Sequence, residues 1–169
     1  MNLFDSHFRR NKLHYLLQCL LASAAMFTVL AAMRSTSNTA VMASLGASAF
    51  IAFTMPQRHV SRARFLIGGY VVGTAAGTAA WWLTRFVPLP EQFVFIADFP
   101  HVVFGAAAVG LAIFVMVVTN TEHPPAAGLA LGFAILEQWS WLTPAVVLGG
   151  IAGLCGVKLL LRPVLRDLL

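Results

Sequence analysis

The 169-residue chain is 59% hydrophobic and only 10% charged, and its mean hydropathy is +0.82. This composition excludes a soluble domain and is typical of a protein that crosses the membrane several times. The formal net charge of +5 does not indicate a nucleic-acid partner, because the basic residues stand at the ends of apolar runs. We expect one transmembrane domain over residues 1–169, with no soluble domain.

Six apolar segments divide the chain into two similar halves, approximately residues 13–83 and 101–161. Each half contains a long, a short and a long segment, and a polar stretch precedes the short one. The segments are Leu13–Met33, Ala40–Met55, Phe65–Leu83, His101–Val118, Ala126–Leu136 and Pro144–Leu161. Paired interruptions of this kind are typical of transporters with internal repeats. We therefore predict an all-α bundle of two pseudo-symmetric inverted halves, each with two long transmembrane helices and one short or broken helix.

The positions of the basic residues predict the orientation of the chain. Three clusters precede the first segment, separate the second from the third, and close the chain. They are Arg9, Arg10 and Lys12, then Arg58, Arg62 and Arg64, and finally Lys158, Arg162 and Arg166. If all six segments cross, the clusters fall on one side, so we expect both termini in the cytoplasm. A four-span alternative with re-entrant short segments puts the central cluster outside, against this rule. Whether the short segments cross fully stays open.

The first segment resembles a signal peptide in its basic lead-in, but it is longer than a usual signal core and further apolar segments follow. We interpret it as a retained span. The sequence shows no extension like a transit peptide, so we expect a multi-pass protein of a bacterial inner (plasma) membrane. Cys19 and Cys155 both fall inside apolar runs and are expected to be free thiols.

Polar breaks precede both short segments, at residues 34–39 and 119–125. Irregular backbone at membrane depth survives only inside protein or beside a water-filled cavity. Asn38 and Thr39 suit a helix N-cap, and Pro124 and Pro125 suit a first helical turn. We predict that the N-termini of the two short helices face each other near mid-membrane and bind an anion through unpaired N–H groups.

The expected substrate-binding residues lie in these breaks and just inside the two short helices. From the first half they are Ser37, Asn38, Thr39, Ser44, Gly46 and Ser48. From the second half they are Asn120, Thr121, His123, Pro124, Pro125, Ala126 and Gly128. Small residues also let helices pack closely, so a packing role for them stays open.

Glu122 and His123 are adjacent ionisable residues in an apolar region. In one interpretation Glu122 is simply solvated at the cytoplasmic lip. In the other, Glu122 or His123 carries a proton coupled to anion movement, because buried carboxyl and imidazole groups can titrate near neutral pH. Both residues are therefore proton-coupling candidates.

Glycines recur every fourth residue at Gly69, Gly73 and Gly77, which predicts close helix contacts within or between subunits. A chain this small can bury little of a transport pathway, and we therefore expect a homo-oligomer. The Gly69–Gly77 face is a candidate surface for contact between its subunits. Four tryptophans at the predicted outer ends are typical of an aromatic belt. They are Trp81, Trp82, Trp139 and Trp141.

No enzyme motif is present in the sequence. It has no HExxH metal-binding pair, no P-loop and no nucleophile elbow. We therefore expect no catalytic residue, no metal, no cofactor and no enzymatic activity. The expected partners are a small anion, the lipid bilayer and further copies of the chain.

Two motifs carry a resemblance to a known family. The tripeptide His123-Pro124-Pro125, within 121–128, and the run Leu45-Gly46-Ala47-Ser48-Ala49 are similar to the HPP and GASA elements of the HPP family of integral membrane proteins. The resemblance covers about residues 13–161. It implies four membrane spans and transport, since cyanobacterial and chloroplast members are implicated in nitrite transport. We expect a transporter or channel for a small monovalent anion, nitrite first. The alternative is a non-transporting membrane scaffold or assembly protein.

Overall fold

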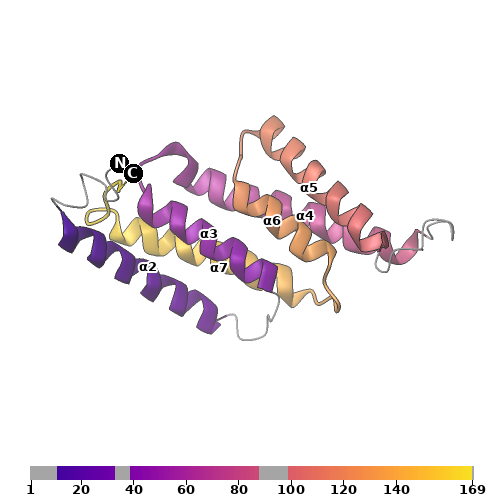
Figure 1. The fold of residues 1–169 in the computed structure, drawn as a ribbon, viewed down its shortest axis with the longest axis horizontal. Coiled ribbons are helices and arrows are strands. Elements are labelled where there is room, and N and C mark those ends of the chain that lie inside the picture. The colour runs from indigo at the N-terminus through magenta and orange to yellow at the C-terminus, as the bar shows by residue number, and fades with distance from the viewer. Residues whose placement is uncertain (1–10, 33–38, 88–98, 169) are drawn as a thin grey trace, which may run out of the picture.

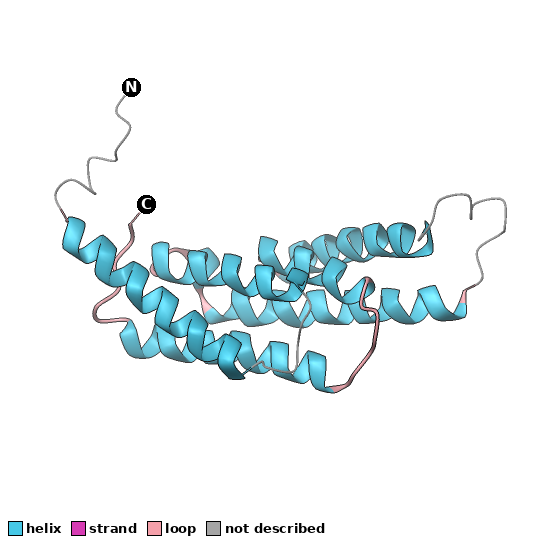
Figure 2. Ribbon diagram, turned by 60° about the horizontal axis from the view of Figure 1, so that its bottom comes forward, coloured by secondary structure: helices cyan, strands magenta, loops and turns pink. Residues whose placement is uncertain are grey.

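The computed structural model describes residues 11–32, 39–87 and 99–168. These residues form six α-helices and one short 3-10 helix, with no strand in the described ranges (Figures 1 and 2). The elements are α2 (Lys12–Ala32), α3 (Thr39–Thr54), η1 (His59–Ser61), α4 (Ala63–Phe86), α5 (Phe99–Thr119), α6 (Pro124–Ala134) and α7 (Leu142–Leu161).

Each predicted apolar segment forms one helix, and every helix end lies within three residues of its predicted position. Four helices, α2, α4, α5 and α7, are long and apolar enough to cross a membrane. The other two, α3 and α6, have 16 and 11 residues, which is about 24 and 17 Å of helix against a hydrocarbon core of about 30 Å. The all-helical fold is confirmed. The inverted pseudo-symmetry of the halves stays a prediction.

Consecutive helices run in alternating directions. Gln18, near the start of α2, donates a hydrogen bond to the Phe53 carbonyl near the end of α3. Arg64, at the start of α4, donates to the Thr119 carbonyl at the end of α5 (3.0 Å). The Trp81 indole near the end of α4 donates to the carbonyl of Leu136, just after α6 (2.8 Å). The two short helices therefore reverse the chain like the long ones.

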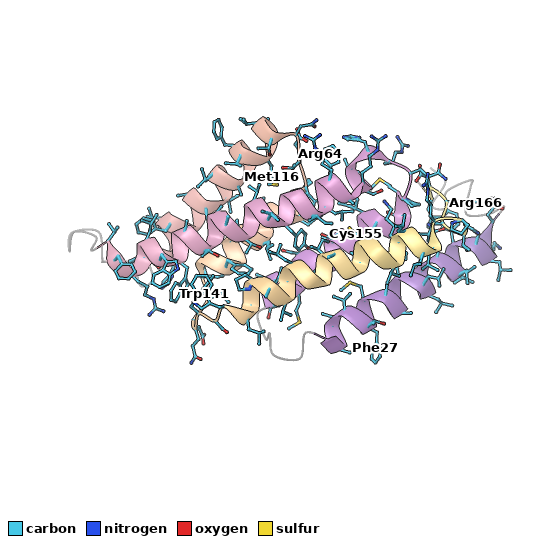
Figure 3. All side chains as sticks on the ribbon, turned by 180° about the vertical axis from the view of Figure 1, so that it is seen from behind. Phe27, Arg64, Met116, Trp141, Cys155 and Arg166 are labelled. Carbon is cyan, nitrogen blue, oxygen red and sulfur yellow. The ribbon has the colours of Figure 1, made fainter. Side chains whose placement is uncertain are left out.

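This alternation brings the basic residues of three separate sequence regions to one end of the bundle, called here the basic end. It contains Lys12, Arg58, Arg62, Arg64, Lys158, Arg162 and Arg166. Trp141 lies at the opposite end from Arg166 (Figure 3). Arg9 and Arg10 fall outside the described residues. The clustering is the arrangement expected for six alternating segments, and the side of the membrane that the basic end faces stays a prediction.

The tryptophans gather at the other end. The Trp81 ring lies 5.3 Å from both Trp82 and Trp139, and Trp139 lies 5.7 Å from Trp141. Trp81 is buried, and Arg85 stacks over its ring at 4.8 Å. Trp81 thus packs inside the bundle, whereas 74% of Trp141 is exposed, as an aromatic belt requires.

Helix α6 lies in the centre of the bundle, packed against α3, α4 and α5. Its contact with α4 depends on glycine. A Cβ atom at Gly73 or Gly77 would overlap the carbonyl oxygen of Ala126 or Ala130. The Gly69–Gly77 face is therefore occupied within the chain. The expectation that it joins subunits is wrong, because it forms the groove that receives α6.

The outer helices expose apolar side chains. Phe27 on α2, labelled in Figure 3, is 74% exposed. Phe114 on α5 is 65% exposed and Leu160 on α7 is 79% exposed. Apolar surface of this extent is unfavourable in water and suits contact with lipid.

Candidate functional site

Three polar side chains meet in the apolar interior, and we call them the central polar cluster. They are Ser48 of α3, Tyr70 of α4 and His123, the N-cap of α6, and none has any exposed surface. Ser48 Oγ lies 2.8 Å from the Tyr70 hydroxyl and 2.8 Å from His123 Nε2. The rings of Tyr70 and His123 are 5.8 Å apart.

The backbone before α6 sets the position of His123. Asn120 takes the left-handed conformation (φ 53°), which turns the chain at the end of α5. His123 itself is extended (φ −141°, ψ 95°) and directly precedes the two prolines. A Cβ at Gly69 would come within 2.6 Å of His123 Cβ, so glycine there lets the histidine approach α4 closely.

Hydrogen-bond counting assigns the protons of the central polar cluster. The Ser48 hydroxyl donates to the Ser44 carbonyl one turn earlier (2.9 Å). Its two lone pairs then accept from the Tyr70 hydroxyl and from His123 Nε2–H. His123 Nδ1 is left as a bare acceptor, and no described residue bonds to it. Burial lowers the pKa of His123, which lies in the connection between α5 and α6, to about 4, so the ring is neutral at pH 7.

A second buried polar atom without a hydrogen-bond partner in the described chain is Thr74 Oγ1. Thr74 follows Tyr70 by one helical turn, so both lie on the same side of α4. Buried polar atoms are nearly always paired, and exceptions need an explanation.

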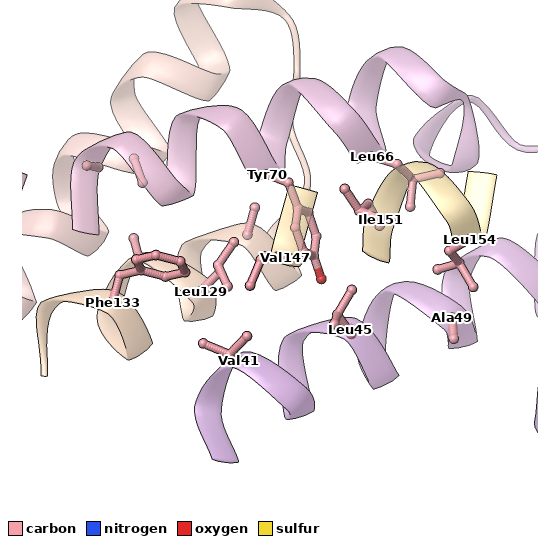
Figure 4. Packing of buried hydrophobic residues seen from close by; sticks show 14 of the residues in the cluster. Val41, Leu45, Ala49, Leu66, Tyr70, Leu129, Phe133, Val147, Ile151 and Leu154 are labelled. Atoms are coloured by element: carbon pink, nitrogen blue, oxygen red, sulfur yellow. The ribbon is translucent and has the colours of Figure 1, made fainter. Parts of the chain in front are cut away.

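Tyr70 is the functional candidate that sequence reasoning missed. It points from α4 toward α3, between Leu45 and Ile151 (Figure 4). The sequence signal that could have identified Tyr70 is its hydroxyl group within an apolar segment, because a buried tyrosine usually finds a hydrogen-bond partner. Its position beside Gly69 and Gly73, the glycines that face α6, indicates that it lies in the interior.

The structure brings together part of the predicted site. Ser44, Ser48, His123 and Ala126 are buried in the contact of α3 with α4 and α6, and Ser44 Oγ faces Gly128. The side of Gly46 where a Cβ would project is open. Ser37 and Asn38 lie outside the described residues.

The remaining predicted residues lie near the surface. Thr39, Asn120 and Pro124 are exposed, and Pro125 is half-buried. Thr121 packs on Gly68 and lies 2.8 Å from the Thr119 hydroxyl, and Glu122 is half-buried beside it.

The prediction that the two short helices meet at their N-termini is wrong. Ala40, at the start of α3, lies beside Gly132 near the end of α6, where a Cβ would come within 2.9 Å of Ala40 Cβ. His123, at the start of α6, lies beside Ser48, in the middle of α3. The reason is that small residues along both helices let them pack side by side in opposite directions, which separates the two starts.

The start of α6 also has few free N–H groups. Pro124 and Pro125 have none, and the N–H of Ala126 donates to the His123 carbonyl (2.8 Å). The start of α6 therefore offers few backbone N–H groups to an anion.

Two cavities of similar volume lie at opposite ends of the bundle. One, of about 790 Å³, opens at the basic end between the Pro56–Ala63 connection and the end of α7. The other, of about 800 Å³, lies between α5 and α6 and is lined by Arg85, His101 and Glu137 beside apolar residues. In the described ranges, His, Cys, Asp and Glu side chains form no group of three that could hold a metal ion.

An apolar bundle of alternating helices with a polar cluster in its interior defines a polytopic membrane protein. The family description "HPP, transmembrane region" matches residues 8–167, nearly the whole chain. The chain belongs to the HPP family. No curated protein and no solved structure matches it.

Proposed function

We propose that this protein is a transporter or channel for a small monovalent anion, with nitrite as the first candidate. The observation that carries the proposal is the central polar cluster, three fully buried polar side chains from α3, α4 and the N-cap of α6. Polar groups inside a membrane bundle are costly and usually mark a substrate or ion pathway. Membership of the HPP family supports a membrane protein with a transport role.

The chemistry of the cluster favours an anion of low charge. Tyr70 carries a hydroxyl donor and His123 an N–H donor, and Ser48 accepts from both while its own proton goes to the Ser44 carbonyl. None of the three side chains is a carboxylate. Neutral donors can replace the hydration of a single negative charge, whereas a doubly charged anion would need a buried cation beside it. Tight packing around the cluster, shown by the Gly69 contact, favours a small ion.

Binding requires the cluster to open. In the present arrangement the Tyr70 and His123 donors are both directed at Ser48. An anion that replaces Ser48 as their acceptor must separate α3 from α4 and α6 at this level. Such a movement would also expose Thr74 Oγ1, which can donate to the ion, and His123 Nδ1, an acceptor that can bind only its water. Neither atom has a hydrogen-bond partner in the described chain.

Proton coupling through Glu122 or His123 is part of the proposal. The neutral ring of His123 would have to be protonated in an opened state, and Glu122 is the neighbouring carboxylate. A Glu122→Gln protein tests this directly. If its nitrite flux keeps the pH dependence of the unmodified protein, Glu122 has no part in coupling.

The proposal is tested by nitrite entry into liposomes that contain the purified protein, with and without an imposed pH gradient. Saturable entry that responds to the gradient supports a proton-coupled carrier, and entry indifferent to it supports a uniporter or channel. Entry no faster than in empty liposomes contradicts nitrite as the substrate.

The specific observation that favours a structural role instead is that Ser48 joins three helices through one oxygen atom. If the cluster serves assembly alone, its variants lose thermal stability or assembly, and the unmodified protein transports none of a panel of small anions.

A further inference from the structure

The cavity at the basic end has the features of a second binding site. It is about 790 Å³ in volume, and the described residues that line it include two arginines and a lysine but no acidic residue. Arg62 comes from the connection before α4, and Lys158 and Arg162 from the end of α7. The site therefore joins two regions that are far apart in the sequence.

The positive charge in the cavity is only partly balanced by the described residues. Lys158 and Arg162 are one helical turn apart, so their charges repel. The guanidinium groups of Arg62 and Arg162 form no ion pair in the described chain. The nearby carboxylate of Asp167 is 3.7 Å from Arg58, accepts from the Gln57 N–H (2.9 Å) and also attracts Lys158, so one acidic residue is shared among several cations.

Lys158 is held in place rather than freely solvated. It is half-buried, and its ammonium group donates to the carbonyl and to the hydroxyl of Ser61 (2.7 Å to Oγ). An ammonium has three donors, so one remains after these two bonds. The cavity thus contains one positioned cation and two arginines whose planar groups suit a phosphate.

We propose that this cavity binds the phosphate headgroup of an anionic phospholipid. A water molecule occupies about 30 Å³ in the liquid, so a three-atom anion would leave most of the cavity unfilled. Leu159, which lines the cavity, is 67% exposed and provides apolar surface for an acyl chain. Basic pockets between transmembrane helices bind anionic lipid headgroups in this way. The proposal does not depend on the transported ion.

The test compares two double variants of equal charge. Arg62→Gln with Arg162→Gln removes two cations from the cavity. Lys12→Gln with Arg64→Gln removes two exposed cations from the same end that do not line it. Binding of short-chain phosphatidylglycerol, phosphatidylcholine and inorganic phosphate to each detergent-solubilised protein is measured by native mass spectrometry. We expect selective phosphatidylglycerol binding that weakens at least tenfold in the cavity variant and less than twofold in the control.

Each other outcome overturns the proposal. Equal loss of phosphatidylglycerol binding in both double variants means that the positive charge of this end attracts the lipid without a specific site. Inorganic phosphate that competes at the same concentration as the lipid means a free-anion site. Equal binding of both lipids means no headgroup recognition.

Cys155 provides a second readout that is independent of the variants, because it lines the cavity. In a Cys19→Ser protein, phosphatidylglycerol should slow the alkylation of Cys155 at least threefold, and phosphatidylcholine should not. An unchanged alkylation rate places the lipid elsewhere.

Discussion

At the scale of single residues, the burial of His123 decides its chemistry. The imidazole has no exposed surface, and its hydrogen bond to Ser48 uses one nitrogen only. Burial lowers the pKa of His123 from its ordinary 6.5 to about 4, so folding favours the neutral ring. The unfolded chain binds a proton in a pH range where the folded chain does not.

This difference predicts how stability depends on pH. Because the folded pKa is lowered, the contribution of His123 is complete above about pH 6.5 and is lost as the pH falls towards 4. The apparent melting temperature of the purified protein should fall over this range, and His123→Gln should flatten the fall. The same pH dependence in both proteins would contradict the assignment of a buried neutral histidine.

Tyr70 shows why part of the candidate site could not be predicted from the sequence. The HPP and GASA motifs identified His123 and Ser48, because polar residues in apolar segments are conspicuous. Tyrosine is common in membrane helices as an interfacial residue, so its type alone does not show whether it faces inward. That assignment required knowing that the Gly69 and Gly73 side of α4 packs inside the chain, which the hydropathy pattern does not show.

At the scale of helices, the close contact between α4 and α6 is the one that the sequence predicted. The glycine repeat predicted a close approach, and the structure identifies α6 as the partner. The offset of α3 against α6 was not predictable, because runs of small residues permit several registers with similar packing. The predicted meeting of helix starts failed for that reason.

The α4–α6 contact predicts a large difference between two glycine substitutions. Gly73→Ala puts a methyl group onto the Ala126 carbonyl and should destabilise the protein by about 1–3 kcal/mol. Gly149→Ala on α7 meets nothing within 4 Å and should be neutral or stabilise by up to about 1 kcal/mol. Thermal unfolding in detergent measures both, and equal effects would contradict the packing.

At the scale of the whole molecule, apolar composition and basic clusters predicted most of the architecture. Helix ends were accurate because the apolar runs are bounded by charged or helix-breaking residues, as at Pro56 and Pro124. Alternation of all six helices places Arg58 and Lys158 at one end and Glu137 at the other. The oligomeric state could not be predicted from the glycine repeat, because α6 fills the face that was expected to join subunits.

The alternating arrangement predicts a labelling pattern in a membrane. In a protein with Cys19 and Cys155 replaced by serine, a cysteine at Gln57 should react only from the cytoplasmic side. A cysteine at Ser140 should react only from the other side. Reaction of both positions from the same side would contradict the alternation of the short helices.

The central claim is that the buried polar cluster binds the transported anion, and the most direct test is nitrite flux through Tyr70→Phe protein in liposomes. This change keeps the ring and removes one donor, which costs about 1 kcal/mol of stability. Tyr15→Phe is the matched control, since that hydroxyl bonds the Leu168 carbonyl at the basic end. We predict that Tyr70→Phe lowers saturable nitrite entry at least tenfold in folded protein, while Tyr15→Phe keeps it within twofold. Unchanged entry through folded Tyr70→Phe protein would contradict the account.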